Sequence, residues 1–215
     1  MEEIAPHVVF TVLGVPIRDT VVSTWAMMAI VTAIAIVVGR RRPAALEMLV
    51  DFLNDTISGL MGRRATPYLP FLGSLAIFIA AANILGIIPG LQAPTRDLNA
   101  PAALALVVFF SVHYYGIQEK GVVDYMRDLA SPIFLLPLEI VSQISRTISL
   151  SVRLFGNILS GELIVAIIFA LVPLFVPLPL VGLSIFTGLL QAYIFTALAT
   201  VYIASGLQAS GSMAQ

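Results

Sequence analysis

The chain contains no cysteine, only two histidines and few charged residues. Without cysteine, disulfides, thiolate nucleophiles and cysteine-ligated metals are excluded, and two histidines are too few for a histidine-rich metal centre. Eleven Lys and Arg are balanced by twelve Asp and Glu, so the chain has no basic surface that could bind nucleic acid. We therefore expect no cofactor, no metal site and no nucleic-acid partner.

Charge is scarce because hydrophobic residues dominate the composition. Only 11% of the 215 residues are charged, against about 25% in an ordinary soluble domain, and 59% are hydrophobic. The mean hydropathy is +1.01. A chain of this length can form about five membrane-spanning segments of ~20 residues with short connections. The composition thus predicts one polytopic domain over residues 1–215, embedded in lipid, with no separate soluble domain.

Long uncharged stretches predict three near-upright transmembrane helices, at about 20–39, 67–89 and 98–118. The first is not expected to be a cleaved signal, because it is longer than the usual apolar region of ~7–15 residues and positive charge follows it. Between the first two spans, Pro43 can begin a helix over about 44–62. Its apolar residues recur at helical spacing, while Glu47, Asp51 and Asp55 line another face. This pattern predicts an amphipathic helix at the membrane interface with a solvated acidic face.

The last third of the chain predicts two helices that are longer than a membrane is thick. They cover about 133–172 and 180–207 and are separated by a cluster of prolines. Within the first of them, the uninterrupted helical pattern from Pro137 to Val172 has 36 residues and measures about 54 Å, whereas the hydrocarbon core is ~30 Å thick. We therefore expect an antiparallel pair of long, strongly tilted helices. With the preceding segments, the fold class is an all-α integral membrane protein.

The distribution of basic residues predicts the orientation of the chain. Two basic residues, Arg18 and Arg96, flank the spans on one side. Seven flank them on the other: Arg40, Arg41, Arg42, Arg63, Arg64, Lys120 and Arg127. By the positive-inside rule, the N-terminus is outside and the C-terminus is on the cytoplasmic side.

Arg153 lies in the middle of the first long helix, among apolar neighbours. A charged side chain at mid-bilayer costs from ~3 to more than 10 kcal/mol, so this arginine requires a partner or water; snorkelling to the interface is the alternative. Polar residues share its face to within about 40°. They are Glu139, Ser142, Arg146, Ser149, Asn157 and Ser160.

Glu162 is the second charged residue expected to carry function. It lies nine residues after Arg153, on the opposite face and about 13 Å along the axis. The two charges therefore cannot neutralise each other within the helix. A desolvated carboxylate can take up and release protons near neutral pH, which predicts a relay group.

The last helix carries small residues at four-residue steps. They are Ser184, Gly188, Ala192, Thr196 and Thr200. Such a ridge lets two helix backbones approach closely in lipid, so we expect it to pack against the other long helix. Gln191 lies beside the ridge and is expected to be functional, because polar groups at membrane depth are costly.

Three motifs resemble those of one known family. The run ISLSVRLFGNILSGEL (residues 148–163) closely resembles the signature of subunit a of rotary F-type ATP synthases, the membrane stator that faces the ring of c subunits. NILGIIPG (residues 83–90) and LLQAYIFTALATVYIA (residues 189–204) resemble that family's motifs on an earlier span and on the last helix. The resemblance covers nearly the whole chain in consistent order.

The resemblance implies roles for individual residues, none of them catalytic. Arg153 resembles the essential arginine that passes the carboxylate of each c subunit, and Glu162 resembles the acidic residue of the half-channel open to the outside. The polar positions that line or support the two aqueous half-channels match Glu139, Ser149, Asn157 and Gln191. Ser184 stands where many family members carry a histidine or an acid, which leaves the composition of the outer path open.

The resemblance also implies partners and a location. The partners would be the ring of c subunits, the peripheral-stalk b subunits and, indirectly, the soluble ATPase sector. The transported ion would be H⁺ or Na⁺, and the sequence does not decide between them. The chain would be a multi-pass protein of the plasma (inner) membrane or of an energy-transducing organelle membrane.

The alternative is a stand-alone secondary transporter or ion channel. A secondary transporter is expected to show inverted repeats, and the sequence shows no internal symmetry. An intramembrane enzyme is disfavoured because the chain has no H-E-x-x-H or S-x-x-K motif. We therefore expect an ion-translocating subunit that is not an enzyme on its own.

Overall fold

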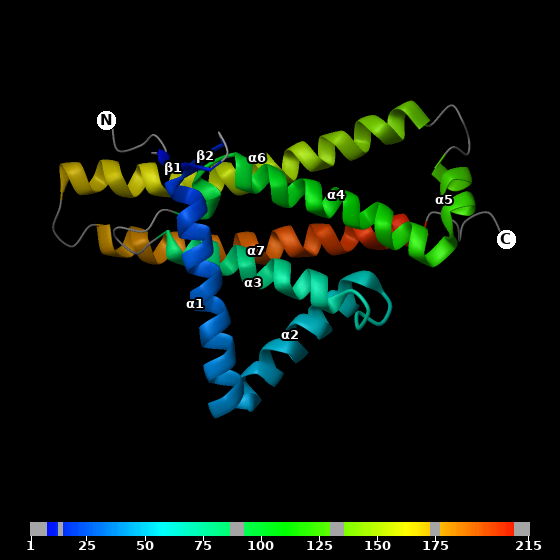
Figure 1. Ribbon diagram of the computed structural model, residues 1–215, viewed down its shortest axis with the longest axis horizontal. Helices are drawn as coiled ribbons and strands as arrows, with labels where there is room; N and C mark the ends of the chain where they lie inside the picture. The colour runs from blue at the N-terminus through cyan, green and yellow to red at the C-terminus, as the bar shows by residue number, and fades with distance from the viewer. Residues whose placement is uncertain (1–7, 13–14, 87–92, 130–135, 173–176, 209–215) are drawn as a thin grey trace.

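The computed structural model describes residues 8–12, 15–86, 93–129, 136–172 and 177–208 (Figure 1). This part of the chain is almost entirely helical. Its α-helices are α1 (Asp19–Arg41), α2 (Pro43–Met61), α3 (Leu69–Leu85), α4 (Asn99–Lys120), α5 (Val122–Leu129), α6 (Leu136–Leu171) and α7 (Pro177–Gln208). Four of them, α1, α4, α6 and α7, are long and apolar enough to cross a membrane. The two long C-terminal helices expected from the sequence are α6 and α7.

The described chain is all-helical, as expected, except for a short hairpin before α1. Strands β1 (Val8–Val12) and β2 (Val15–Arg18) form a two-stranded antiparallel sheet before α1. β1 is rich in valine and β2 contains valine and isoleucine, and these β-branched residues favour strands. Each is also too short to be found by a search for stretches of membrane-spanning length. The short helix α5 was missed for the same reason.

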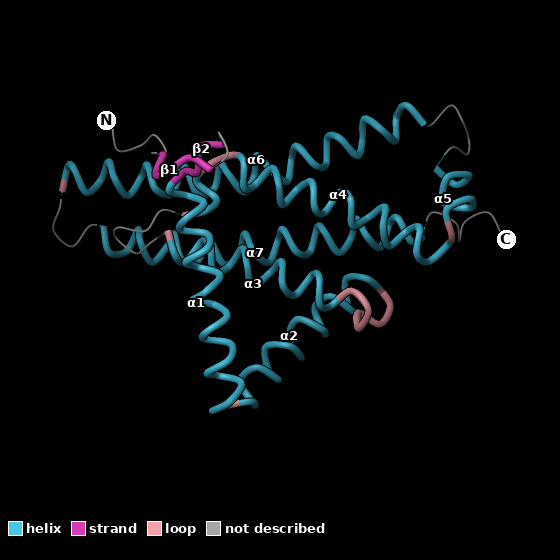
Figure 2. The backbone as a smooth tube through the Cα atoms, viewed as in Figure 1, coloured by secondary structure: helices cyan, strands magenta, loops and turns pink. Residues whose placement is uncertain are grey.

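The three helices expected to be near-upright do not all run parallel to one another. In Figure 1, α3 and α4 run along the long pair α6 and α7, whereas α1 crosses them at a steep angle. The backbone trace in Figure 2 shows the same arrangement. Since α1 is not parallel to α3 and α4, the three cannot share one upright direction. The length of an apolar stretch limits whether a helix can span the membrane, but packing against neighbours sets its direction.

Helix α3 is shorter than the segment expected at about 67–89. It has 17 residues and ends at Leu85, which gives a length of about 26 Å. The proline and glycine expected to end it, Pro89 and Gly90, lie outside the described residues.

The core lies where α3, α4, α6 and α7 meet. Its largest fully buried side chain is Phe195 of α7. Buried aliphatic residues of the other helices pack in the same cluster, among them Leu72, Ile79, Ala105, Val108, Leu150 and Leu154. By contrast, α1 exposes many large apolar side chains, including Trp25. Such an exposed apolar surface is typical of a helix that faces lipid.

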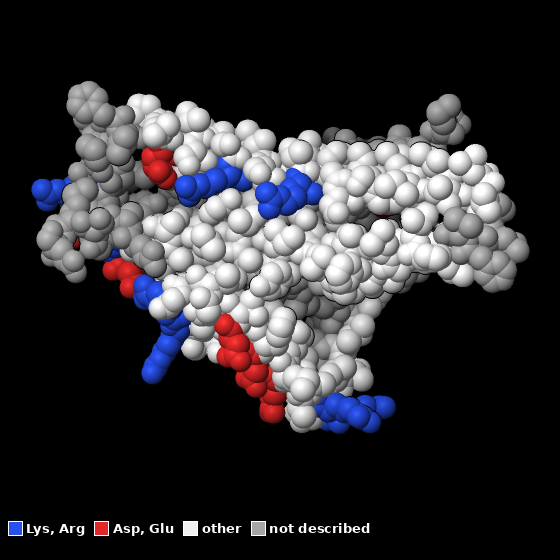
Figure 3. Space-filling model, turned by 180° about the vertical axis from the view of Figure 1, so that it is seen from behind, with Lys and Arg blue, Asp and Glu red and all other residues white. Residues whose placement is uncertain are grey.

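Helix α2 forms a corner with α1 and leads back to the core (Figure 1). Pro43 occupies its first turn. Ile57 and Met61 are buried in the core, whereas Glu47, Asp51 and Asp55 are exposed. Figure 3 shows acidic side chains in a row over this helix. The helix is therefore amphipathic, and its location at the membrane interface stays a prediction.

Candidate functional site

Arg153 is exposed on α6, although it lies within a helix that is apolar enough to span a membrane. Its neighbour Leu154 is fully buried, so the helix presents the guanidinium on the side away from the core. Within the described part of the chain, Arg153 has no hydrogen bond and no ion pair. An unpaired guanidinium in lipid is costly, so this face requires water or another molecule.

Other polar residues of α6 extend from Arg153 towards the beginning of the helix. Before Arg153, the charged residues of α6 are Glu139 and Arg146. Glu139 accepts a hydrogen bond from Nε2 of Gln143 at 3.0 Å. The guanidinium carbon of Arg146 lies 5.2 Å from the centre of the Tyr202 ring, a cation–π contact with α7. This side of α6 therefore carries a continuous polar stripe, which also includes the exposed Ser149.

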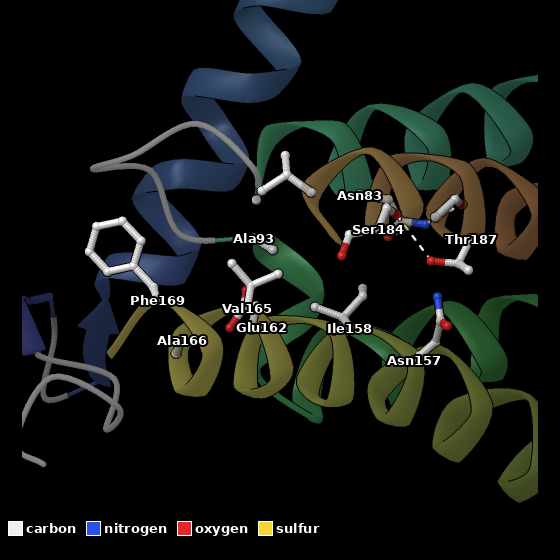
Figure 4. Close-up of a pocket in the computed structure, with 14 residues that line it drawn as sticks. Asn83, Ala93, Asn157, Ile158, Glu162, Val165, Ala166, Phe169, Ser184 and Thr187 are labelled. Atoms are coloured by element: carbon white, nitrogen blue, oxygen red, sulfur yellow. Dashed lines mark hydrogen bonds between the residues drawn. The ribbon is translucent and has the colours of Figure 1, made fainter. Parts of the chain in front are cut away.

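A cavity lies further along α6 than Arg153, towards the end of the helix. It is located between α6 and the helices α3 and α7. Its volume is about 300 Å³, several times the ~30 Å³ that a water molecule occupies in the liquid. Figure 4 shows its lining side chains, with those of α6 opposite those of α3 and α7. The polar lining residues are Asn83, Asn157, Glu162, Ser184 and Thr187. The cavity is therefore largely apolar, with a few polar groups, and it is large enough for several water molecules.

Glu162 reaches this cavity and forms an ion pair that the sequence did not predict. Nε of Arg96 lies 3.1 Å from Oε2 of Glu162, and the two side chains are 20% and 29% exposed. Arg96 lies in the 3-10 helix η2 (Pro94–Arg96), which packs against α6. The sequence pattern assigns Arg96 to the flank of a span and does not indicate a partner for it. Two features of the sequence could have indicated this pair. Arg96 is a charged residue between two spans, and Glu162 is an acid at membrane depth with no partner on its own helix.

The small residue Gly188 packs against α3. Nδ2 of Asn83 in α3 donates a hydrogen bond to the carbonyl oxygen of Gly188 at 2.7 Å. A Cβ atom at Gly188 would lie 2.9 Å from Cβ of Asn83. The expectation that Gly188 contacts the other long helix is therefore wrong. Residue spacing identifies a small-residue face of α7 but not which of its neighbours lies on it.

Helices α6 and α7 approach each other closely at Ser184. A Cβ atom at Gly161 would lie 3.6 Å from Oγ of Ser184, which is ordinary van der Waals contact. Of the remaining residues expected on the ridge or beside it, Ala192, Thr196 and Gln191 are all buried. Ser184 thus faces α6 while Gly188, one turn later, faces α3.

Several buried polar atoms in this region lack a hydrogen-bond partner within the described residues. They are Oδ1 of Asn83, Oγ1 of Thr95, Nε2 of Gln191 and Oγ1 of Thr196. Buried polar groups in proteins are usually hydrogen-bonded to protein or to water. Since Asn83 lines the cavity, water there could bond to its free oxygen. The site is therefore suited to hold water beside a carboxylate at membrane depth.

Comparison with known proteins places this arrangement in a family. Residues 20–204 match the family model described as ATP synthase A chain. The ATP synthase subunit a 2 of Bradyrhizobium sp. (strain BTAi1) is 47% identical over 214 residues, which cover 96% of this chain and 95% of the relative. The subunit a 2 of Picosynechococcus sp. is 43% identical over 201 residues, covering 89% and 86%. The subunit a of Legionella pneumophila is 37% identical over 212 residues, covering 94% and 92%.

These similarities extend over almost the full length of both partners, and the matched region contains every helix from α1 to most of α7. The chain therefore belongs to the family of subunit a of the F-type ATP synthase, and it is a non-catalytic membrane subunit.

Proposed function

We propose that this chain is a stator that couples the flow of H⁺ or Na⁺ across the membrane to rotation of a ring of c subunits, with Arg153 facing the ring. The observation that carries this proposal is the exposed Arg153, which has no ion pair among the described residues. A carboxylate on a neighbouring subunit would supply the missing negative charge. The outer face of α6 is then the surface that meets the ring.

Two ion paths are proposed to reach Arg153 from opposite ends of α6. The outer path contains the cavity lined by Glu162, Asn157 and Ser184. The second path follows the polar stripe through Glu139 and Ser149. Glu162 and Glu139 are nine and fourteen residues from Arg153, or about 13 and 21 Å along the helix axis. The paths are therefore offset, and an ion cannot pass directly from one to the other.

This offset, together with the charge of Arg153, accounts for coupling. A carboxylate on the ring must be neutral while it faces hydrocarbon and can be charged only where it meets Arg153. An ion that enters by one path therefore travels with the ring almost a full turn before it leaves by the other. Each charge supplies about 2.3 kcal/mol per 100 mV of membrane potential. A guanidinium suits this position because it does not lose its proton and so does not carry ions itself.

The partners follow from the same proposal. They are the ring of c subunits, the peripheral-stalk b subunits and, through them, the soluble ATPase sector. We propose that the N-terminus is outside and the C-terminus is cytoplasmic, in the plasma (inner) membrane or an energy-transducing organelle membrane. Purification in mild detergent tests the proposed partners. The ring and a soluble ATPase should co-purify with the chain, and the complex should drive ion uptake after reconstitution into vesicles. A purified chain that transports ions alone would contradict the proposal.

Replacing Glu162 with glutamine should slow ion passage without opening a leak. The amide keeps the size and polarity of the side chain but cannot exchange a proton. Because water in the cavity can partly replace one relay group, we expect residual coupled activity rather than complete loss. Flux of H⁺ or Na⁺ should be measured in reconstituted vesicles at several pH values, with and without Na⁺.

The matched control for this variant is Glu47→Gln, which alters an exposed acid on α2 and should leave flux unchanged. A Glu162→Gln variant with complete loss of flux and no pH dependence would contradict the proposed relay.

A further inference from the structure

We propose that Arg96 is a positioning residue for ion transport, which holds the Glu162 carboxylate at the cavity and favours its ionised form. This inference rests on the proposed function, because it concerns the outer ion path. The observation behind it is the distance of 3.1 Å between Nε of Arg96 and Oε2 of Glu162. The two residues come from different elements, η2 and α6, so their contact is a product of the fold.

Arg96 is held in place by a well-packed segment. Thr95 and Ala93, just before it, are 0% and 1% exposed. A Cβ atom at Gly86 would lie 2.7 Å from Cβ of Ala93, so this segment lies directly against the end of α3. The backbone N–H of Arg96 donates to the carbonyl oxygen of Ala93 at 3.0 Å. A charged group on such a support is pre-oriented and loses little entropy when it pairs.

Within the described part of the chain, the neighbours of Glu162 from other helices contribute polar but uncharged groups. Helix α3 contributes Asn83, and α7 contributes Ser184 and Thr187. Arg153, on α6 itself, points away from Glu162 by the helical spacing. Two acidic residues occur near η2 in the fold. Asp97 directly follows Arg96, and Asp19 is the first residue of α1, which contacts η2. The charged side chain that contacts Glu162 is Arg96.

The ion pair has a direct consequence for ion binding and release. A carboxylate in a partly buried cavity is less costly when a guanidinium offsets its charge. An incoming cation must compete with Arg96 for the carboxylate, and Arg96 then favours release of that cation. Since arginine stays protonated, this bias is present at every working pH. Arg96 would thus keep Glu162 from holding an ion too tightly.

The Arg96→Gln variant tests the inference, because glutamine is polar and removes only the charge and part of the length. We expect the pH at which H⁺ flux is half-maximal to rise by about 1–2 units, since a nearby arginine stabilises a carboxylate by that order. At pH values below this midpoint, flux should fall about tenfold for each unit of the shift, because the ionised fraction there changes tenfold per pH unit. Arg96→Lys, which keeps the charge, should retain most of the flux and most of the wild-type profile.

Two controls separate this effect from structural damage. Arg64→Gln removes an exposed arginine from the segment between α2 and α3 and should leave the profile unchanged. In a Glu162→Gln background, Arg96→Gln should cause no further shift, because the group through which it acts is gone. All fluxes are normalised to the amount of assembled complex in the vesicles.

The inference is overturned if Arg96→Gln keeps the wild-type profile, if Arg96→Lys behaves like Arg96→Gln, or if the shift persists in the Glu162→Gln background. Its failure can be told apart from failure of the proposed function. An Arg153→Ala variant that still pumps ions overturns the proposed function itself. An inactive Arg153→Ala variant together with an unshifted Arg96→Gln profile overturns only the role of Arg96.

Discussion

Replacing Arg153 with alanine should abolish ATP-driven ion transport while the subunit remains inserted and assembled. Arg153 is exposed and makes no hydrogen bond or ion pair within the described residues, so its loss removes little from the packing of the chain. The lost group acts on a charge that passes on another subunit. Transport should be measured as ATP-driven uptake into vesicles, and assembly as the amount of ring and soluble ATPase that co-purifies.

The Arg153→Lys variant should restore little of this activity. A lysine ammonium lacks the planar fork of arginine and can lose its proton when it is desolvated. The control is Arg64→Ala, another exposed arginine, which should pump normally. Normal ATP-driven pumping by Arg153→Ala would refute the role assigned to this residue.

The second large effect is expected for Gly188→Leu. A Cβ atom at this position would lie 2.9 Å from Cβ of Asn83, so a leucine must push α7 away from α3. The shift would also strain the hydrogen bond from Asn83 to the Gly188 carbonyl. Inserting extra atoms into packed regions costs typically 1–3 kcal/mol and occasionally more. We expect the assembled subunit to fall several-fold, with transport lost in proportion.

Gly182→Leu is the matched control for this prediction. Gly182 lies on the same helix, and a Cβ atom there would meet nothing within 4 Å. Crosslinking between cysteines placed on α3 and α7 should decrease in Gly188→Leu and stay unchanged in Gly182→Leu. Unaltered crosslinking and transport in Gly188→Leu would show that the close approach of the two helices is not needed.

The sequence was sufficient to predict the features that depend on a single helix. Uncharged length indicated α1 and α7, because a span requires a long run of apolar residues. An uninterrupted helical pattern without an internal proline indicated α6. Helical geometry alone placed Glu162 about 13 Å from Arg153 and on the opposite face. In the structure Arg153 is exposed and Glu162 lines the partly open cavity between α6, α3 and α7, which agrees with that geometry.

Features that depend on contacts between elements could not be predicted in this way. The partner of Glu162 is Arg96, 66 positions earlier in the sequence. The neighbour of Gly188 is Asn83 on α3 and not a residue of α6, as the ridge had suggested. The directions of α3 and α4 likewise follow from packing against α6 and α7, because a hydropathy pattern contains no information about which helices become neighbours.

The most direct test of the central claim is disulfide crosslinking between this chain and the ring. The chain contains no cysteine, so single cysteines can be introduced without further changes. The variants are Ser149→Cys, one turn before Arg153 on the exposed stripe, and Ser74→Cys, an exposed serine on α3. Each is combined with one cysteine beside the ion-binding carboxylate of the c subunit. The account predicts rapid crosslinking from position 149 and none from position 74, whereas crosslinking from position 74 alone would contradict it.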